Sequence, residues 1–190
     1  MLLTVAGLGK KWDGRRLFDG IGLSLSRGEI LGLSGPSGCG KTTLLSILAG
    51  LDRDHAGTVT WSGEPKLAMV FQSPRLLPWR TAVENVALAA GGDRRRALEM
   101  LRKVGLGDAA GLYPSRLSLG MARRVALARA LAAGPDVLLL DEAFVSLDPL
   151  SADLARAAVR EAVARGMAVL SVSHDRQELE AMADRVLVLS

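Results

Sequence analysis

One stretch of this chain has the residue types and spacing of a loop that binds the phosphates of a nucleotide. It comprises Gly35, Pro36, Ser37, Gly38, Cys39, Gly40, Lys41 and Thr42, which is a glycine, four residues, and then Gly-Lys-Thr. Glycines let backbone N–H groups turn inward to form an anion nest, and a following helix adds its partial positive charge. We expect Lys41 to reach the β- and γ-phosphates and the Thr42 hydroxyl to bind Mg²⁺.

A second candidate for chemistry is the carboxylate pair Asp141-Glu142, which directly follows the apolar run 137–140. Such a run is typical of a central parallel strand buried on both faces, and ligands bind at the carboxyl ends of such strands. We expect Asp141 to hold Mg²⁺, through water, and Glu142 to orient or deprotonate an attacking water. The alternative is that both are solvated carboxylates at the end of a strand.

The elements needed to position these residues alternate between strands and helices, which predicts an α/β fold with a largely parallel sheet. Apolar runs predict strands over 29–34, 58–61, 67–71, 137–140, 167–173 and 185–189. Helices are predicted over 43–50, over 119–133, after Asp148-Pro149, and over 81–110 with a loop at Gly91-Gly92. Ser118 and Asp148 stand where N-cap residues are expected, and Pro149 suits a first helical position.

Length and composition fit one globular domain, because the 190 residues are 49% hydrophobic and 23% charged. No apolar run approaches the ~18 residues of a membrane span, and no signal peptide is evident, so we expect a soluble cytoplasmic protein. A net charge of +4 is too small to indicate nucleic acid as a partner. Cys39 is the single cysteine, which excludes an internal disulfide.

Three further features allow more than one interpretation. Trp12 is either a half-buried strand aromatic or a platform on which a nucleotide base stacks. The segment 73–79 is apolar for a loop, so it either forms a contact surface or folds back onto its own core. The run 94–96 of three arginines is interpreted as a solvated helix face, and no function is assigned to it.

Six segments follow one another in a fixed order: the phosphate loop, Phe71-Gln72, Leu117-Ser118-Leu119-Gly120-Met121, the acidic pair Asp141-Glu142, Ser146-Leu147-Asp148 and His174. In this order they resemble the phosphate loop, glutamine loop, signature, second acidic motif, D-loop and switch histidine of the ATP-binding subunits of ABC transporters, and the resemblance covers nearly the whole chain. The resemblance implies a phosphate-loop NTPase fold with a mostly parallel central sheet and an antiparallel N-terminal β part. It also implies one ATP-binding domain over 1–190 that contains a small helical subdomain over roughly 75–133.

The resemblance also implies a mechanism in which two ATP-binding subunits, expected to be a homodimer, pack head to tail around two ATP molecules. Ser118 and the Gly120 backbone would bind the γ-phosphate in the partner's site, and Asp148 would lie at the same nucleotide interface. Gln72 would ligate Mg²⁺ and sense a membrane permease, and His174 would contact the γ-phosphate. Trp12 would stack on adenine, and Thr43 would join the phosphate-binding loop.

Within that family the chain looks like importers of nitrate, sulfonate, taurine and related small solutes. The residues that carry this likeness are Phe71-Gln72, the segment 76–79, Thr81, the segment 84–86 and Met121. The likeness implies a transmembrane permease as partner, a solute-binding protein as an indirect partner, and a peripheral position on the inner face of the cell membrane. A non-transport relative and a small-molecule kinase with a phosphate loop are the alternatives.

Three departures from the family pattern bear on activity. Leu119 replaces the first glycine of the signature, where a side chain could weaken closure of the pair. Ala143 stands where the family commonly has proline. The sequence ends soon after His174, so we expect it to lack a C-terminal regulatory domain.

Overall fold

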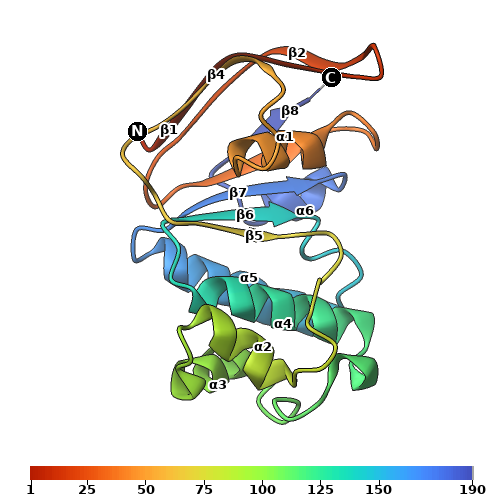
Figure 1. Cartoon of the computed structure of the whole chain (residues 1–190), viewed down its shortest axis with the longest axis vertical. Helices are drawn as coiled ribbons and strands as arrows, with labels where there is room; N and C mark the ends of the chain where they lie inside the picture. Colours follow the sequence, from red (N-terminus) through yellow and green to blue (C-terminus); the bar gives the residue numbers. More distant parts are fainter. Residues whose placement is uncertain (190) are drawn as a thin grey trace.

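A parallel sheet of five strands forms the centre of the protein in the computed structural model, which describes residues 1–189 (Figure 1). Its strand order is β5-β6-β7-β3-β8. The strands are β3 (Ile30–Ser34), β5 (Leu67–Val70), β6 (Val137–Asp141), β7 (Ala168–Ser173) and β8 (Arg185–Val188). Every residue of β3, β6 and β7 is buried, as their continuous apolar runs predict for strands covered on both faces.

The register of the parallel sheet brings the ends of three strands to one edge. Ser34 of β3 pairs with Ser173 of β7, and Asp141 of β6 pairs with the neighbouring Val172. Residues that follow these strands therefore emerge side by side, although more than a hundred positions separate Ser34 from Asp141 in the sequence.

An antiparallel sheet of order β2-β1-β4 lies above α1 (Lys41–Leu48) in Figure 1 and completes a sandwich with the parallel sheet. Its strands are β1 (Leu3–Trp12), β2 (Arg15–Leu25) and β4 (Ala56–Trp61). Leucines of α1 and of both sheets form one buried cluster, which includes Leu8, Leu33, Leu44 and Leu170. This cluster anchors α1, whose first residue is Lys41, between two rigid layers.

Helices cover the opposite face of the parallel sheet, where α4 (Leu119–Ala132) and α5 (Pro149–Val163) lie against it (Figure 1). The helices α2 (Ala82–Ala89) and α3 (Arg94–Lys103) pack farther out, and the 3-10 turn Pro114–Arg116 precedes α4. The short α6 (Arg176–Glu180) follows β7. Within residues 1–189, no helix has the length and apolar character needed to cross a membrane.

Most predicted elements are present, and the differences lie at their ends. Ser118 caps α4 by accepting a hydrogen bond from Met121 N–H at 3.2 Å, and Asp148 caps α5 through Ser151 N–H at 3.0 Å. The predicted helical segment 81–110 forms two helices, the second of which ends at Lys103, and turns follow. Gly105, two residues after Lys103, has a φ of 71°, a left-handed conformation that a right-handed helix does not contain.

The buried amide of Asn85 holds the segment before α2 in place. Its side chain is fully buried, and Oδ1 accepts a hydrogen bond from Leu77 N–H at 2.8 Å. Its Nδ2 donates to the carbonyls of Leu77, Arg80 and Thr81 at 3.0–3.2 Å. The Asn85 side chain thus supplies hydrogen-bond partners to backbone N–H and C=O groups of a loop that has no regular secondary structure.

Asn85→Ala is expected to lower the free energy of unfolding by about 2–4 kcal/mol, because several buried backbone groups lose their partner. Urea unfolding followed by circular dichroism measures the change. Leu88→Ala on the same helix is the matched control, because Leu88 is 56% exposed and should change stability by about 0.5 kcal/mol or less. Equal effects of the two substitutions would contradict this role of Asn85.

Candidate active site

The phosphate loop connects β3 to α1, and its glycines adopt conformations that other residues avoid. Gly38 has a φ of 82° and Gly40 a φ of 95°, both in the left-handed region that favours glycine. A Cβ on Gly40 would also lie 2.8 Å from the ring of Phe18. The backbone therefore requires glycine at these positions before any ligand is considered.

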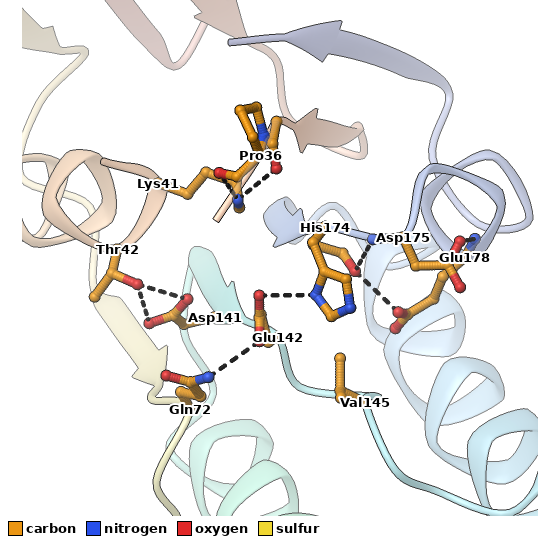
Figure 2. A network of polar contacts seen from close by, with 12 residues as sticks. Pro36, Lys41, Thr42, Gln72, Asp141, Glu142, Val145, His174, Asp175 and Glu178 are labelled. Carbon is orange, nitrogen blue, oxygen red and sulfur yellow. Dashed lines mark hydrogen bonds and ion pairs between the residues drawn. The ribbon is translucent and has the colours of Figure 1, made fainter. Parts of the chain in front are cut away.

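Lys41 lies at the centre of this loop. It is 6% exposed, and its Nζ donates to the carbonyl oxygens of Gly35 at 2.6 Å and of Pro36 at 2.9 Å (Figure 2). The Cys39 N–H donates to the same Pro36 carbonyl at 3.3 Å. The loop is therefore folded around a buried cation, whereas Ser37 and Gly38 at its tip are exposed.

Thr42 and Asp141 meet across the sheet edge, as their positions after β3 and at the end of β6 predict. The Thr42 hydroxyl is 2.9 Å and 3.1 Å from the two carboxylate oxygens of Asp141 (Figure 2). Burial raises the pKa of the Asp141 carboxyl above its ordinary value, although the hydrogen bond from Thr42 opposes that shift. A hydroxyl and a desolvated carboxylate are thus gathered beside Lys41.

Glu142 links two other segments of the chain. Its Oε2 accepts from Gln72 Nε2 at 3.1 Å, and its Oε1 lies 3.1 Å from His174 Nδ1 (Figure 2). The backbone of Glu142 has a φ of 49°, a left-handed conformation that costs a non-glycine residue about 1–3 kcal/mol. Its N–H is held by the carbonyl of Val172 at 3.0 Å, so the surrounding sheet maintains the strained conformation.

Comparison with known proteins identifies the family to which this arrangement belongs. The profile of the family described as "ABC transporter" matches residues 18–145, which is more than half of the chain. The chain belongs to the ABC transporter family. It is an ATP-binding subunit of that family, and its enzymatic activity is the hydrolysis of ATP.

Relatives of this ABC ATPase support the assignment along nearly its whole length. It is 46% identical to the aliphatic sulfonates import ATP-binding protein SsuB 2 of Paracoccus denitrificans, over 98% of this chain and 77% of that protein. It is 47% identical to SsuB 1 of Streptomyces avermitilis, over 98% of this chain and 72% of that protein. A solved dimeric ATP-binding cassette in a post-hydrolysis state with ADP and Pi superposes with a TM-score of 0.90 at 28% identity, covering 100% of this chain and 94% of that one.

Trp12 of the ABC ATPase is not the half-buried aromatic that a strand position suggested. Its side chain is 61% exposed and lines a surface hollow together with Thr42 and Thr43. The structure therefore brings the predicted base platform beside the first turn of α1.

The signature and D-loop of the ABC ATPase lie against each other and form no hydrogen bond to the phosphate loop within residues 1–189. A Cβ on Gly120 would lie 3.4 Å from the Leu147 side chain and 3.8 Å from the Ser146 carbonyl. Leu119 beside it is 56% exposed. The sequence-predicted site residues thus form two groups in one chain, with Ser118, Gly120 and Asp148 outside the cluster built around Lys41.

Sequence reasoning missed a group of polar contacts beside His174. Ser173 Oγ donates to Glu178 Oε2 at 3.0 Å and accepts from Asp175 N–H at 3.1 Å (Figure 2). Burial raises the pKa of the Glu178 carboxyl above its ordinary value. The one available signal was a glutamate four residues after His174 on a predicted helix, which is too common a pattern to single out.

Proposed function

We propose that this ABC ATPase subunit closes in pairs on ATP and thereby drives a separate membrane permease that imports aliphatic sulfonates. The observation that supports sulfonates as the transported solutes is the 46–47% identity, over 98% of the chain, to proteins named as sulfonate import subunits. We further propose that residues 1–190 act as one ATP-binding domain, in which the helices of 75–133 move as a subdomain. A solute-binding protein would deliver the sulfonate to the permease, and the ATPase would sit at the cytoplasmic face of the membrane through that permease.

The residues around Thr42 fit a Mg²⁺ ion bound together with ATP. The desolvated Asp141 carboxylate and the Thr42 hydroxyl are hard oxygen ligands, and Gln72, whose amide nitrogen is bonded to the adjacent Glu142, would offer its amide oxygen. No group of three or more His, Cys, Asp or Glu side chains in residues 1–189 could hold a metal by itself. A site with one protein carboxylate suits Mg²⁺, which is usually bound by one or two carboxylates plus substrate phosphates. When bound, the ion would neutralise charge on the β- and γ-phosphates.

The chemistry assigned to the chain's own residues is positioning, charge stabilisation and proton transfer. Lys41 would exchange its carbonyl partners for phosphate oxygens, aided by the N–H groups of the loop from Gly35 to Thr43. Glu142 would orient the attacking water and accept its proton at a carboxylate oxygen. His174 would hold Glu142 and contact the γ-phosphate, and Trp12 would stack on adenine.

Ser118 and Gly120 would act in the site of the partner subunit. Within residues 1–189 neither residue forms a hydrogen bond to the phosphate loop, which supports the proposal that a second chain supplies the signature to each ATP. The Ser118 hydroxyl and the N–H groups at the start of α4 would face the γ-phosphate, a favourable end of the helix for an anion. Asp148 of the adjacent D-loop would contribute to the same interface.

Leu119→Gly is expected to increase ATP turnover, because it removes a 56%-exposed side chain from the surface that meets the phosphate. The substitution costs about 1 kcal/mol of helix propensity at most, so the subunit should remain folded. Steady-state phosphate release from purified protein measures the effect. Unchanged turnover would show that Leu119 does not restrain closure.

The apolar segment before α2 is proposed to receive the permease. Leu76 packs against the core, whereas Trp79 is 70% exposed, so the segment both folds back and presents a contact surface. Arg129 fixes its start by donating to the carbonyls of Pro74 and Arg75 at 3.0 and 2.8 Å. With Asn85 holding its other end, the segment is a rigid platform beside Gln72, which would pass the state of the ATP site to the permease.

Trp79→Ala is expected to abolish ATP-driven uptake while leaving the ATPase activity of the isolated subunit within about twofold, because Trp79 is a surface residue outside the core. Uptake of a radiolabelled aliphatic sulfonate into proteoliposomes that contain the subunit, its permease and ATP is the measurement. The same assay tests the proposed function, since wild-type protein that hydrolyses ATP but moves no sulfonate would contradict the solute class. Normal uptake by Trp79→Ala would contradict only the docking role.

A further inference from the structure

A second cavity lies at the end of the molecule opposite the phosphate loop. Its volume is about 830 Å³, within the range of small-molecule sites. It is lined by Asp136 and Met167, which precede β6 and β7, so it lies at the amino ends of strands whose carboxyl ends carry the ATPase residues (Figure 1). Its walls come from α3, the end of α4 and the end of α5.

Apolar side chains form one part of the wall of this cavity, which charged residues otherwise dominate. Leu131, Ala158 and Met167 line it and are each 6–7% exposed, and Met100 of α3 adds a flexible thioether side chain. These side chains belong to the main core cluster or pack against it, so they form a fixed floor. An alkyl chain placed there would be removed from water.

The rim of the cavity is cationic, and its acidic residues are already engaged. Asp136 pairs with Arg27 at 3.0 Å, and Glu99 pairs with Lys103 at 3.4 Å. Asp93 accepts a hydrogen bond from the backbone N–H of Arg96, as the cap of α3. Lys103 and Arg165, also at the rim, share the carboxylate of Glu161.

Two guanidinium groups of the rim form no ion pair with a carboxylate in the described part of the chain. They belong to Arg95 and Arg96, within the arginine run that sequence analysis left without a function. Arg96 extends across the cavity, because its Nη2 lies 2.8 Å from the point where a Cβ on Gly134 would stand. Gly134 follows the end of α4, so the guanidinium of Arg96, although the residue is exposed, lies against the wall of the cavity.

We propose that this cavity binds a small, free organic anion with an alkyl chain, distinct from ATP. The alkyl chain would lie on the floor formed by Leu131, Ala158 and Met167. The head group, a sulfonate, carboxylate or phosphate, would accept hydrogen bonds from Arg95 and Arg96, whose planar guanidinium groups suit such oxygen pairs. The ligand would touch both α3 and α5 and so join the outer helices to the sheet layer. This inference does not depend on the solute that the permease carries.

Isothermal titration calorimetry with sodium hexanesulfonate tests the proposal, with the subunit saturated with ADP so that the phosphate loop is filled. We expect wild-type protein to bind, and affinity to rise about three- to fourfold for each methylene added to shorter alkanesulfonates. The double variant Arg95→Gln/Arg96→Gln should bind about tenfold more weakly or worse. Arg94→Gln is the matched control, because Arg94 is an exposed neighbour on α3 that does not line the cavity.

Retained ATP hydrolysis by the double variant would show that it is folded. Three results would each overturn the proposal: no binding by wild-type protein, equal binding by the double variant and Arg94→Gln, or binding of inorganic sulfate as tight as that of hexanesulfonate. Sulfate carries the head-group charge without the alkyl chain, so the last comparison tests the apolar floor separately from the two arginines.

Discussion

Glu142→Gln is expected to reduce ATP turnover by about 10²–10⁴-fold, the usual contribution of a positioned general base. The amide keeps the size of the carboxylate and can still accept a hydrogen bond from His174, but it cannot take a proton from water. Affinity for ATP should change by less than about threefold, because Glu142 does not belong to the phosphate loop. Steady-state hydrolysis and nucleotide titration separate the two effects.

The same variant should also pair in the presence of ATP. Because it holds unhydrolysed ATP, the closed pair should accumulate, and light scattering should record a monomer-to-dimer shift on ATP addition. Glu180→Gln is the matched control, since Glu180 is an exposed carboxylate of α6 paired with Arg176. Wild-type turnover in Glu142→Gln would remove Glu142 from the mechanism. ATP binding without pairing would instead indicate a different partner chain or an impaired signature.

Lys41→Ala is expected to weaken ATP binding by at least about a hundredfold, because it removes a buried cation that, as proposed, would make charge-assisted hydrogen bonds to phosphate. Lys41 Nζ is also the donor that holds the carbonyls of Gly35 and Pro36, so the loop itself should loosen. Calorimetric titration with ATP measures the affinity, and thermal unfolding checks that the sheet and α1 remain folded.

Lys11→Ala provides the comparison for Lys41→Ala. Lys11 is an exposed lysine next to Trp12 and is absent from the residues that line the hollow beside α1. Its loss should leave ATP affinity within about twofold, as for other exposed charges. If both lysine variants bound ATP equally well, the assignment of the phosphate site to Lys41 would fail.

Residues close together in sequence were predicted well, because local rules govern them. The glycine spacing before Lys41 identified the phosphate loop, and the capping positions of Ser118 and Asp148 located the starts of α4 and α5. The buried run that became β6 predicted a central parallel strand. The family resemblance added a function that composition could not supply, and the match to residues 18–145 confirms that family.

Contacts between distant segments depended on the tertiary structure. Glu142 meets Gln72 and His174 only because β5, β6 and β7 are neighbours in register. The exposure of Trp12 could not be inferred from a strand pattern, because it depends on what covers each face of the sheet. The four hydrogen bonds of Asn85 were likewise invisible in the sequence.

The arginine run shows the same division between sequence and structure. From the sequence, residues 94–96 are a charged helix face, and helix α3 does carry them at exposed positions. Only the packing of α3 beside the ends of α4 and α5 directs Arg95 and Arg96 to a cavity, while Arg94 stays outside it. The sequence alone thus predicted a phosphate-binding segment and the approximate positions of most helices and strands. The tertiary structure decided which side chains share a site, because sheet order and helix packing bring together groups that no local pattern relates.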